Sequence, residues 1–402
     1  MLFQTLDNKT QCVGIYTSNK LLFSPVDFPS DLSQTWSYTP YMRGWDVEFA
    51  ALYLEGRKLE DHLPEFLVDD WEDVTKKMRA FKRAHATAKV NMEENCFYDL
   101  VPTRFLVEFC EVKNAITEYI FKKQPRPARY GFYKHVHMML RDMEEYKVSY
   151  DKKLISSFTA DKKLGGHARN ILRSRQQVSY NQFGTITGRL TTRRQSFPIL
   201  TLPRVFRKAI KPNNDMFVEL DFNGAEIRTL LGILERDQPE DDIHIYHLKN
   251  VFEGLPTRSS AKEAFFAWLY GSKKSTTDQQ SQKLDGFYDK SQLLEAHYKD
   301  NTITTPYGKV IKGTSPHHAL NYLIQSTTAE LVLKQALKIH YYLRTYTSSN
   351  LSFIIHDALV LDLRKEDLHH LDNIKKLMSS TNFGTYKINS SAGKNLGELT
   401  SG

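Results

Sequence analysis

The stretch FIIHDALVL, residues 353–361, has the composition of a buried β-strand, yet a histidine and an aspartate stand at its centre. Alternation along a strand places Asp357 on the same face as four apolar residues, Phe353, Ile355, Leu359 and Leu361. An ionised carboxylate on an apolar face is unfavourable unless a cation, a metal ion or a cluster of hydrogen-bond donors compensates it. The stretch therefore predicts a strand whose acid needs a partner.

A second acid of this kind stands in MFVELDFNGAEIR, residues 216–228, which predicts a strand that ends at Asp221 and passes into a helix. If Asp221 and Asp357 lie side by side, their charges repel unless a hard cation such as Mg²⁺ lies between them. Two such carboxylates are typical of a two-metal site for phosphoryl transfer. For each aspartate taken alone, a strand-end or surface acid remains the alternative.

The composition favours a soluble protein with an anionic partner. The 402 residues carry a formal net charge of +8, and a pI near 9.0 suits a polyanion such as a nucleic acid. The cysteines, Cys12, Cys96 and Cys110, are odd in number and lack C-x-x-C spacing, which predicts neither a disulfide nor a zinc knuckle and favours a reducing compartment. No run approaches the ~18 apolar residues of a membrane span, so we expect no membrane partner.

Local patterns outline the organisation of the chain. Residues 11–24 predict a β-hairpin, residues 72–124 are largely helical, and the break KKQPRPARYG indicates a domain boundary near residue 128. Residues 132–158 predict two helices joined by a turn. From residue 216 short strands alternate with amphipathic helices, and the polar segment 271–286 predicts a surface loop.

The segment TRSSAKEAFFAWLYG, residues 257–271, predicts a helix with two cations followed by two aromatic rings on one face. These residues are Arg258, Lys262, Phe266 and Tyr270. The cations suit a triphosphate and the rings suit a base or a sugar. The alternative is a core stripe that stops at Gly271, and a capping box from Ser260 to Glu263 would leave Arg258 before the helix.

Two further segments carry groups that suit nucleic acid. Residues 315–337 predict a helix with Asn321 and Gln325 on one face, where amides can bind base edges or a minor groove, with a plain solvated face as the alternative. The loop FGTITGRLTTRRQSFP, residues 183–198, joins a Thr-Gly-Arg turn to further arginines, and such a loop can hold phosphates or enter a groove.

The order of these motifs resembles that of the family A DNA polymerases, the group that contains bacterial DNA polymerase I and many phage replicases. DFNGAEIR is similar to the family's motif A, with Asp221, Glu226 and Arg228 at its invariant positions. The helix at 258–271 is similar to motif B, and IIHDAL is similar to motif C.

Further matches extend the resemblance over about residues 130–402. TGRL and HHALNYLIQS match two more signatures of the family, and AGKNLGELTSG resembles its closing strand. The segment DDIHIYHLKNVFEG, residues 241–254, is similar to a segment that places His244 near the nucleotide phosphates.

The resemblance implies an α+β fold, a right-hand polymerase with an antiparallel palm sheet, helical fingers and thumb, and a small N-terminal α/β domain. We expect the N-terminal domain at 1–127, the thumb at 128–182, and the palm and fingers at 183–402, with the fingers at about 237–312. The compact size favours a phage enzyme, located in the cytoplasm of a bacterial cell or an infected host.

The implied function is template-directed DNA synthesis, in which deoxynucleotides are added to a primer 3′-hydroxyl with release of pyrophosphate. The implied partners are primer-template DNA and dNTPs, and the resemblance leaves open whether replication accessory proteins also bind. The implied cofactor is a pair of Mg²⁺ ions, held by Asp221, Asp357 and the backbone carbonyl of Phe222.

The resemblance also implies roles for the remaining site residues. Those that would bind the incoming nucleotide are Arg258, Lys262, His244, Phe266, Tyr270 and Glu226. Among them, Glu226 would exclude a ribose 2′-hydroxyl. Those that would contact DNA are Arg189, Asn321, Gln325, His356 and Arg207.

The chain departs from the family pattern at motif C, where Ala358 replaces the usual second acid, and at motif A, where Gly224 and Ala225 replace bulkier residues. Because Asp221 and Asp357 suffice to bind the metals, we expect polymerase activity to survive. The stretch between motif B and HHALNYLIQS is shorter than usual in the family, which implies reduced fingers.

Many relatives carry a 3′-5′ exonuclease upstream of the polymerase. The matching residues here are Asp46 and Glu48 in DVE and Asp99 in NCFYD, but no Y-x-x-x-D occurs before the expected thumb. A degenerate or unrelated N-terminal domain is therefore favoured over an active exonuclease.

Two alternatives share much of this pattern. A single-subunit RNA polymerase has the same palm and two aspartates, but Glu226 together with Asn321 and Gln325 argues for DNA synthesis. A catalytically inactive DNA-binding relative would explain Ala358, but the two aspartates and the cationic helix are intact.

Overall fold

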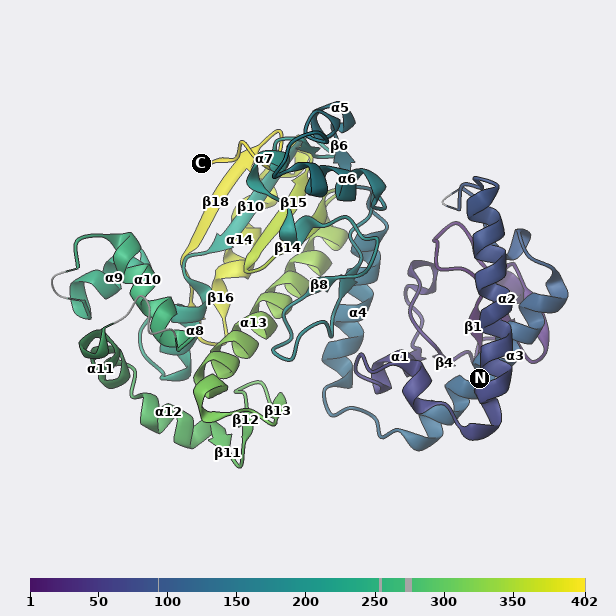
Figure 1. Ribbon diagram of the computed structural model, residues 1–402, viewed down its shortest axis with the longest axis horizontal. Helices are drawn as coiled ribbons and strands as arrows, with labels where there is room; N and C mark the ends of the chain where they lie inside the picture. Colours follow the sequence, from purple (N-terminus) through teal and green to yellow (C-terminus); the bar gives the residue numbers. More distant parts are fainter. Residues whose placement is uncertain (93, 253–254, 272–276, 402) are drawn as a thin grey trace. The chain divides into compact units, whose positions relative to one another are not determined.

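The structure is a computed structural model that describes residues 1–92, 94–252, 255–271 and 277–401 (Figure 1). The chain divides into two compact units, Met1–Glu145 and Tyr146–Gly402. The division follows residue 145, whereas the sequence patterns indicate a boundary near residue 128. The assignments of thumb, palm and fingers to residue ranges stay predictions.

The first unit combines small sheets with four helices in its described residues. The strands are β1 (Gln4–Thr5), β2 (Ile15–Thr17) and β3 (Lys20–Leu22), which form an antiparallel sheet, and the parallel pair β4 (Gln34–Thr35) and β5 (Glu48–Phe49). The helices are α1 (Ala50–Tyr53), α2 (Val68–Thr87), α3 (Thr103–Lys123) and α4 (Tyr130–Glu144). The short 3-10 turns are η1 (Pro25–Asp27), η2 (Pro40–Met42), η3 (Leu59–His62), η4 (Glu65–Leu67) and η5 (Phe97–Asp99). The predicted hairpin and the helical stretch are confirmed.

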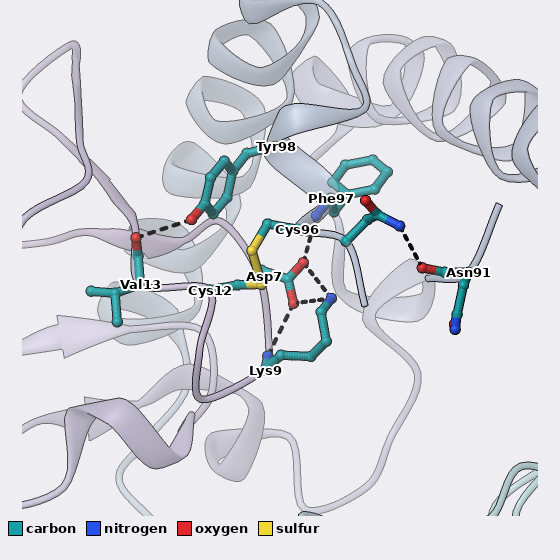
Figure 2. Close-up of a disulfide and its surroundings, with 9 residues drawn as sticks. Asp7, Lys9, Cys12, Val13, Asn91, Cys96, Phe97 and Tyr98 are labelled. Atoms are coloured by element: carbon teal, nitrogen blue, oxygen red, sulfur yellow. Dashed lines mark hydrogen bonds and ion pairs between the residues drawn. A yellow bond between two sulfur atoms is a disulfide. The ribbon is translucent and has the colours of Figure 1, made fainter. Parts of the chain in front are cut away.

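The expectation that the cysteines stay unpaired is wrong. Cys12 and Cys96 form a disulfide (Figure 2). Cys110 is a buried free thiol on α3. Next to the disulfide, Asp7 binds Lys9 Nζ at 2.7 Å and accepts a hydrogen bond from Phe97 N, also at 2.7 Å. An odd cysteine count leaves one thiol free without revealing whether the other two meet, because the fold brings together residues 84 positions apart.

The second unit is built on a five-stranded antiparallel sheet, ordered β14-β15-β10-β18-β19. Its strands are β10 (Met216–Phe222), β14 (Asn350–Ile355), β15 (Ala358–Leu363), β18 (Ile388–Gly393) and β19 (Thr400–Ser401). The long helix α13 (Pro316–Tyr346) runs along this sheet and contacts α8 (Ala225–Ile233) and α14 (Leu371–Ser379), as Figure 1 shows. The central strand β10 is apolar at Val218 and Leu220 on one face and carries its acids on the other.

The motif at 353–361 is not one strand. It is a hairpin in which β14 ends at Ile355, β15 begins at Ala358, and His356 and Asp357 form the turn. His356 has a φ of 58°, the left-handed conformation that a two-residue hairpin turn requires. Because apolar residues precede and follow the turn, alternation along the sequence cannot locate it. Asp357 is therefore placed at the end of the sheet and does not share the apolar strand face.

A helical layer follows β10 and α8. Its helices are α9 (Ile243–Asn250), α10 (Arg258–Leu269), α11 (Asp278–Phe287) and α12 (Lys290–His297), and a small sheet follows with β11 (Tyr298–Lys299), β12 (Thr302–Thr304) and β13 (Val310–Lys312). Phe265, Trp268, Leu284 and Tyr288 belong to the core of this layer.

The loop predicted at 271–286 is wrong for its second half, where α11 lies, and residues 272–276 lie outside the described residues. The helix forms because Thr277 and Gln280 make a capping box and Leu284 is buried.

The remaining elements of the second unit surround this framework. Before β10 lie β6 (Ser149–Tyr150), α5 (Lys152–Ser156), α6 (Gly165–Arg173), β7 (Tyr180–Asn181), β8 (Thr191–Thr192), η6 (Ile199–Thr201), α7 (Arg204–Arg207) and β9 (Ile210–Lys211). After β15 lie η7 (Lys365–His370), β16 (Ser380–Thr381) and β17 (Gly384–Thr385). Within the described ranges, no helix combines the length and the apolar character that a membrane crossing needs.

Candidate active site

Asp221 and Asp357 meet at one end of the five-stranded sheet. Asp221 on β10 pairs across the sheet with Ala358, and Asp357 is the residue directly before Ala358 in the turn. Both line a cavity of about 490 Å³. The two acids that the sequence separates by 136 positions are thus brought together, as the sequence analysis predicts.

Burial disfavours the ionised form of both acids more than the nearby cationic side chains favour it. Burial raises the pKa of Asp221 to about 6, and the charge of Asp357 contributes to the shift. Burial also raises the pKa of Asp357. Asn389 Nδ2 donates a hydrogen bond of 3.4 Å to Asp221 Oδ2. Such a pair provides the hard oxygen donors that Mg²⁺ prefers.

A third acid, Glu219, lies two residues before Asp221 on the same strand. Burial raises its pKa, Arg207 on α7 lowers it, and Asp357 raises it. No group of three or more His, Cys, Asp or Glu side chains within the described residues is arranged to hold a metal ion together. Direct ligands beyond Asp221 and Asp357 would therefore be backbone carbonyls, water or substrate oxygens. Phe222, whose carbonyl the resemblance implies as a ligand, lines the same cavity.

Helix α10 and the C-cap residue that follows it contribute a row of four side chains to the cavity. They are Arg258, Lys262, Phe266 and Tyr270, and all four line it. The rings of Phe266 and Tyr270 stack with a centroid distance of 5.8 Å and an angle of 19° between their planes. The core stripe considered as the alternative is formed instead by the other face, which includes Phe265.

The start of α10 differs from the capping box that the sequence suggests at Ser260 and Glu263. Thr257 is the N-cap and accepts a hydrogen bond from Ser260 N at 3.2 Å. Arg258 is therefore the first residue inside the helix and lies on the same face as Lys262. Two N-cap candidates three residues apart are equivalent by sequence, and the position of the preceding segment decides between them.

His244 lies near the start of α9 and is 3% exposed. Burial lowers its pKa to about 4, and the positive charge of Arg258 contributes, so the imidazole is neutral at pH 7. His244 lines the cavity, and its buried Nδ1 has no hydrogen-bond partner within the described part of the chain. A buried ring nitrogen without a partner is costly in a structural role and is suited to a ligand.

Asp242 is a site residue that the sequence analysis did not single out. It caps α9 by accepting hydrogen bonds from His244 N and Ile245 N, and it binds Arg258 through two bonds of 2.9 and 2.8 Å. Burial alone would raise the pKa of Asp242. The hydrogen bonds from Arg258 and Asn223 outweigh burial and hold this pKa below its usual range. The signal available in the sequence is an aspartate directly before a helix, which is a common N-cap.

Arg228, placed on motif A by the resemblance, is a structural residue. It is fully buried, and its guanidinium donates hydrogen bonds to the carbonyl oxygens of Asn223, Pro239 and Asp241 at 2.8, 2.8 and 3.0 Å. These bonds connect the start of α8 to the segment that precedes α9. Arg228 thereby positions the segment that carries Asp242.

Glu226 stands at the start of α8 and is 6% exposed. It forms an ion pair with Arg189 and accepts a hydrogen bond from Tyr270 Oη at 3.2 Å. Burial raises its pKa and Arg189 lowers it. Glu226 thus contacts both Arg189 and Tyr270, which are also assigned to DNA or nucleotide binding. In this structure the partner of Arg189 is a carboxylate of the protein itself.

Of the other four residues assigned to DNA binding, only His356 lines the cavity. Gln325 Oε1 accepts a hydrogen bond from Thr187 at 2.9 Å. Asn321 has a buried Oδ1 and Arg207 a buried Nε, and within the described residues neither atom has a hydrogen-bond partner. Arg207 interacts by charge with Glu219.

The three residues considered for an exonuclease are not arranged as a metal site. Asp46 is fully exposed and pairs with Lys134, Glu48 pairs with Arg126, and Asp99 is exposed in η5. Among the residues that the structure describes, no group of three potential metal ligands occurs in this unit.

Comparison with known proteins supports the fold. No family model and no curated protein sequence matches the chain. Among solved structures, the POL domain of Pol1 from M. smegmatis, in complex with a DNA primer-template and dNTP, matches with a TM-score of 0.67 and 12% sequence identity. The match covers 98% of this chain and 95% of that chain.

The chain has the fold of that polymerase domain. The predicted mixed α+β polymerase fold is confirmed over nearly the whole length. At 12% identity this likeness shows the fold alone, and the roles of individual residues in the polymerase fold are proposals. Phage origin and a cytoplasmic location stay predictions.

Proposed function

We propose that this protein is a DNA-directed DNA polymerase that adds deoxynucleotides to a primer 3′-hydroxyl and releases pyrophosphate. The observation that carries the proposal is that Asp221 and Asp357 line the same cavity as Arg258, Lys262 and His244. Acids that can bind a cation next to cations that can bind phosphate are what phosphoryl transfer requires. The polymerase fold of the chain supports the same reaction.

The acid pair fits Mg²⁺ because both carboxylates are half-buried and the charge of Asp357 acts on Asp221. Among the described residues, neither carboxylate makes a hydrogen bond to a basic side chain. Asp221 and Asp357 would hold two ions together with the carbonyl of Phe222. When bound, the ions supply activation of the primer hydroxyl and neutralisation of the charge on the triphosphate.

The cationic side of the cavity would bind the triphosphate. Arg258 offers a planar fork that matches phosphate oxygens, and Lys262 adds a compact charge. Neutral His244 would donate one ring N–H to a phosphate oxygen. Because Arg258 is bound to Asp242 in this structure, triphosphate binding would exchange one anionic partner for another.

The sugar and base of the nucleotide would lie against Phe266 and Tyr270. Glu226, held by Arg189 and Tyr270 Oη, would occupy the space that a ribose 2′-hydroxyl needs. Arg189, Asn321, Gln325, His356 and Arg207 would contact the primer and template. Residues 128–182 would act as the thumb and 183–402 as the palm and fingers.

Primer extension with Mg²⁺ tests this proposal and separates it from the two alternatives. We expect extension with dNTPs and little with rNTPs, and we expect loss of extension in Asp221→Asn and Asp357→Asn. Preferential use of rNTPs would indicate an RNA polymerase. Absence of extension with either substrate, by folded protein that binds DNA, would indicate an inactive relative.

A further inference from the structure

Ala358 is the residue at which motif C lacks its second acid. It pairs directly with Asp221 across β10 and β15, and directly paired residues of an antiparallel sheet share one face. The side chain of Ala358 is a methyl group, so this position adds no charge beside Asp221. The acid that the resemblance leads one to expect is therefore missing from the face that carries Asp221.

Glu219 lies on that same face. It is two residues before Asp221 in β10, and residues two apart in a strand point to the same side of a sheet. Glu219 pairs with Val360, two residues after Ala358, which makes Glu219 and Ala358 diagonal neighbours. Diagonal neighbours lie about 7–8 Å apart, which is within reach of a long side chain. The Glu219 carboxylate can therefore reach toward the side of Asp221 where an acid at 358 would stand.

The surroundings of Glu219 compensate its charge only in part. Within the described residues, Glu219 makes no hydrogen bond and no ion pair, and the charge of Arg207 acts on it without such a contact. The charge of Asp357 acts on Glu219, and the charge of Glu219 acts on Asp221. Glu219 is therefore close enough to both acids of the pair to interact with them electrostatically. A half-buried carboxylate in the central strand of a sheet is unfavourable without compensation, which a cation held by Asp221 and Asp357 would supply.

We propose that Glu219 supplies, from β10, the third carboxylate that the site lacks at Ala358. Because no three acidic side chains of the described residues are arranged to ligate one ion, Glu219 acts through water molecules on the ions held by Asp221 and Asp357. It is a positioning residue, which orients bound water and adds negative charge near the cations. This inference rests on the proposed function, since it assigns Glu219 to the cation site of that polymerase.

Binding of Mn²⁺ alone to the metal-free protein, without DNA or nucleotide, tests the proposal by electron paramagnetic resonance of the free ion. We expect Glu219→Gln to weaken Mn²⁺ binding by about tenfold, the usual size of an effect through a second layer of contacts. We expect Ala358→Glu in the Glu219→Gln background to recover most of this loss. Glu366→Gln, at an exposed acid of η7 that pairs with Arg364, is the matched control and should bind as the parent chain does.

In primer extension, Glu219→Gln should raise the Mg²⁺ concentration that gives the half-maximal rate by about tenfold. The KM for dNTP should stay within about twofold of that of the parent chain. A structural defect would change both, and a thermal melt of the metal-free variant checks its fold. If Glu219→Gln does not fold, Ala358→Glu in the parent chain decides the question. A gain in Mn²⁺ affinity under about threefold supports the proposal, because Glu219 already fills the role, and a larger gain overturns it.

The outcomes separate this proposal from the proposed function. If Asp221→Asn loses Mn²⁺ binding and Glu219→Gln keeps the parent affinity, the role of Glu219 is wrong and the polymerase site stands. If Glu219→Gln weakens binding and Ala358→Glu recovers none of it, the replacement of one acid by the other is wrong. If Asp221→Asn binds Mn²⁺ as the parent chain does, the proposed metal site itself fails.

Discussion

Arg258 and Asp242 form a two-bond ion pair, with Nε–Oδ1 at 2.9 Å and Nη2–Oδ2 at 2.8 Å. The pair joins the first residue of α10 to the N-cap of α9, at the side of the cavity where we place the triphosphate. Arg258 therefore has an anionic partner before any nucleotide binds. A triphosphate would have to displace this partner.

Asp242→Asn tests this competition. Asparagine remains a good N-cap, so α9 should persist while Arg258 loses its ion pair. Because a partly exposed ion pair contributes about 0.2–1 kcal/mol, we expect dNTP to bind about 1.4- to fivefold more tightly. The measurement is nucleotide affinity for the protein on a 3′-dideoxy primer-template. Asp241→Asn, at the exposed neighbour that pairs with Lys249, is the control, and weaker binding by Asp242→Asn would show that Asp242 positions Arg258.

Glu226→Ala tests the proposed exclusion of ribonucleotides. Removal of the side chain opens the space next to Tyr270 that a 2′-hydroxyl would need. We expect the ratio of kcat/KM for dNTP over rNTP to fall by about 10- to 100-fold. Tyr270→Phe keeps Glu226 and its ion pair with Arg189, so its ratio should stay close to that of the parent chain. An unchanged ratio in Glu226→Ala would remove Glu226 from substrate selection.

The raised pKa of Asp221 predicts a pH dependence of stability. The pKa is about 6 in the folded protein and 3.8 ordinarily, so between these values the folded state binds more protons than the unfolded state. The free energy of unfolding of the metal-free protein should therefore fall as pH rises through this window, by about 2 kcal/mol from this group. Asp221→Asn should lack this contribution.

Urea unfolding in EDTA at pH 4.5 and 7.5 measures this effect. Asp237→Asn, at an exposed acid after α8, is the control and should behave as the parent chain does. Added Mg²⁺ should recover stability at pH 7.5 in the parent chain and not in Asp221→Asn. Equal pH profiles for the parent chain and Asp221→Asn would contradict the shift.

Arg228→Met tests the connection between α8 and the segment before α9. Methionine fills similar space but leaves the buried carbonyls of Pro239 and Asp241 without donors. We expect a loss of about 3 kcal/mol in the free energy of unfolding, because these buried carbonyl oxygens lose their charged hydrogen-bond donors. Arg228→Lys should be intermediate because a single ammonium cannot reproduce the planar fork. A loss below about 1 kcal/mol would contradict the structural role.

The disulfide between Cys12 and Cys96 should stabilise the first unit. In the chain-entropy model, a crosslink over a separation of 84 residues contributes about 4.5 kcal/mol. Cys12→Ser combined with Cys96→Ser should lower the unfolding midpoint of this unit by the same amount as reduction of the parent chain. Cys110→Ala keeps the disulfide and should keep its sensitivity to reductant, whereas equal midpoints with and without reductant would contradict the bond.

Much of the candidate site was predictable from the sequence because its signals are local. Strand β10 followed by α8, the face shared by Arg258 and Lys262 on α10, and the start of α13 all follow from periodicity and helix signals. The helix predicted at 315–337 continues in the structure to Tyr346. The pairing of Asp221 with Asp357 was predictable for a different reason, since two buried acids without partners are a chemical problem that one cation solves. These inferences use neighbours in the chain or the chemistry of a residue type.

Only the tertiary structure decided the features that depend on distant partners. Turn formation at His356 and Asp357 requires β14 to pair with β15, and the disulfide requires two segments 84 residues apart to meet. The ion pairs of Asp242 and Glu226 join separate elements in the same way. Helix periodicity and capping act over a few residues, whereas strand register and ion pairs depend on packing between segments, which no single stretch of sequence contains.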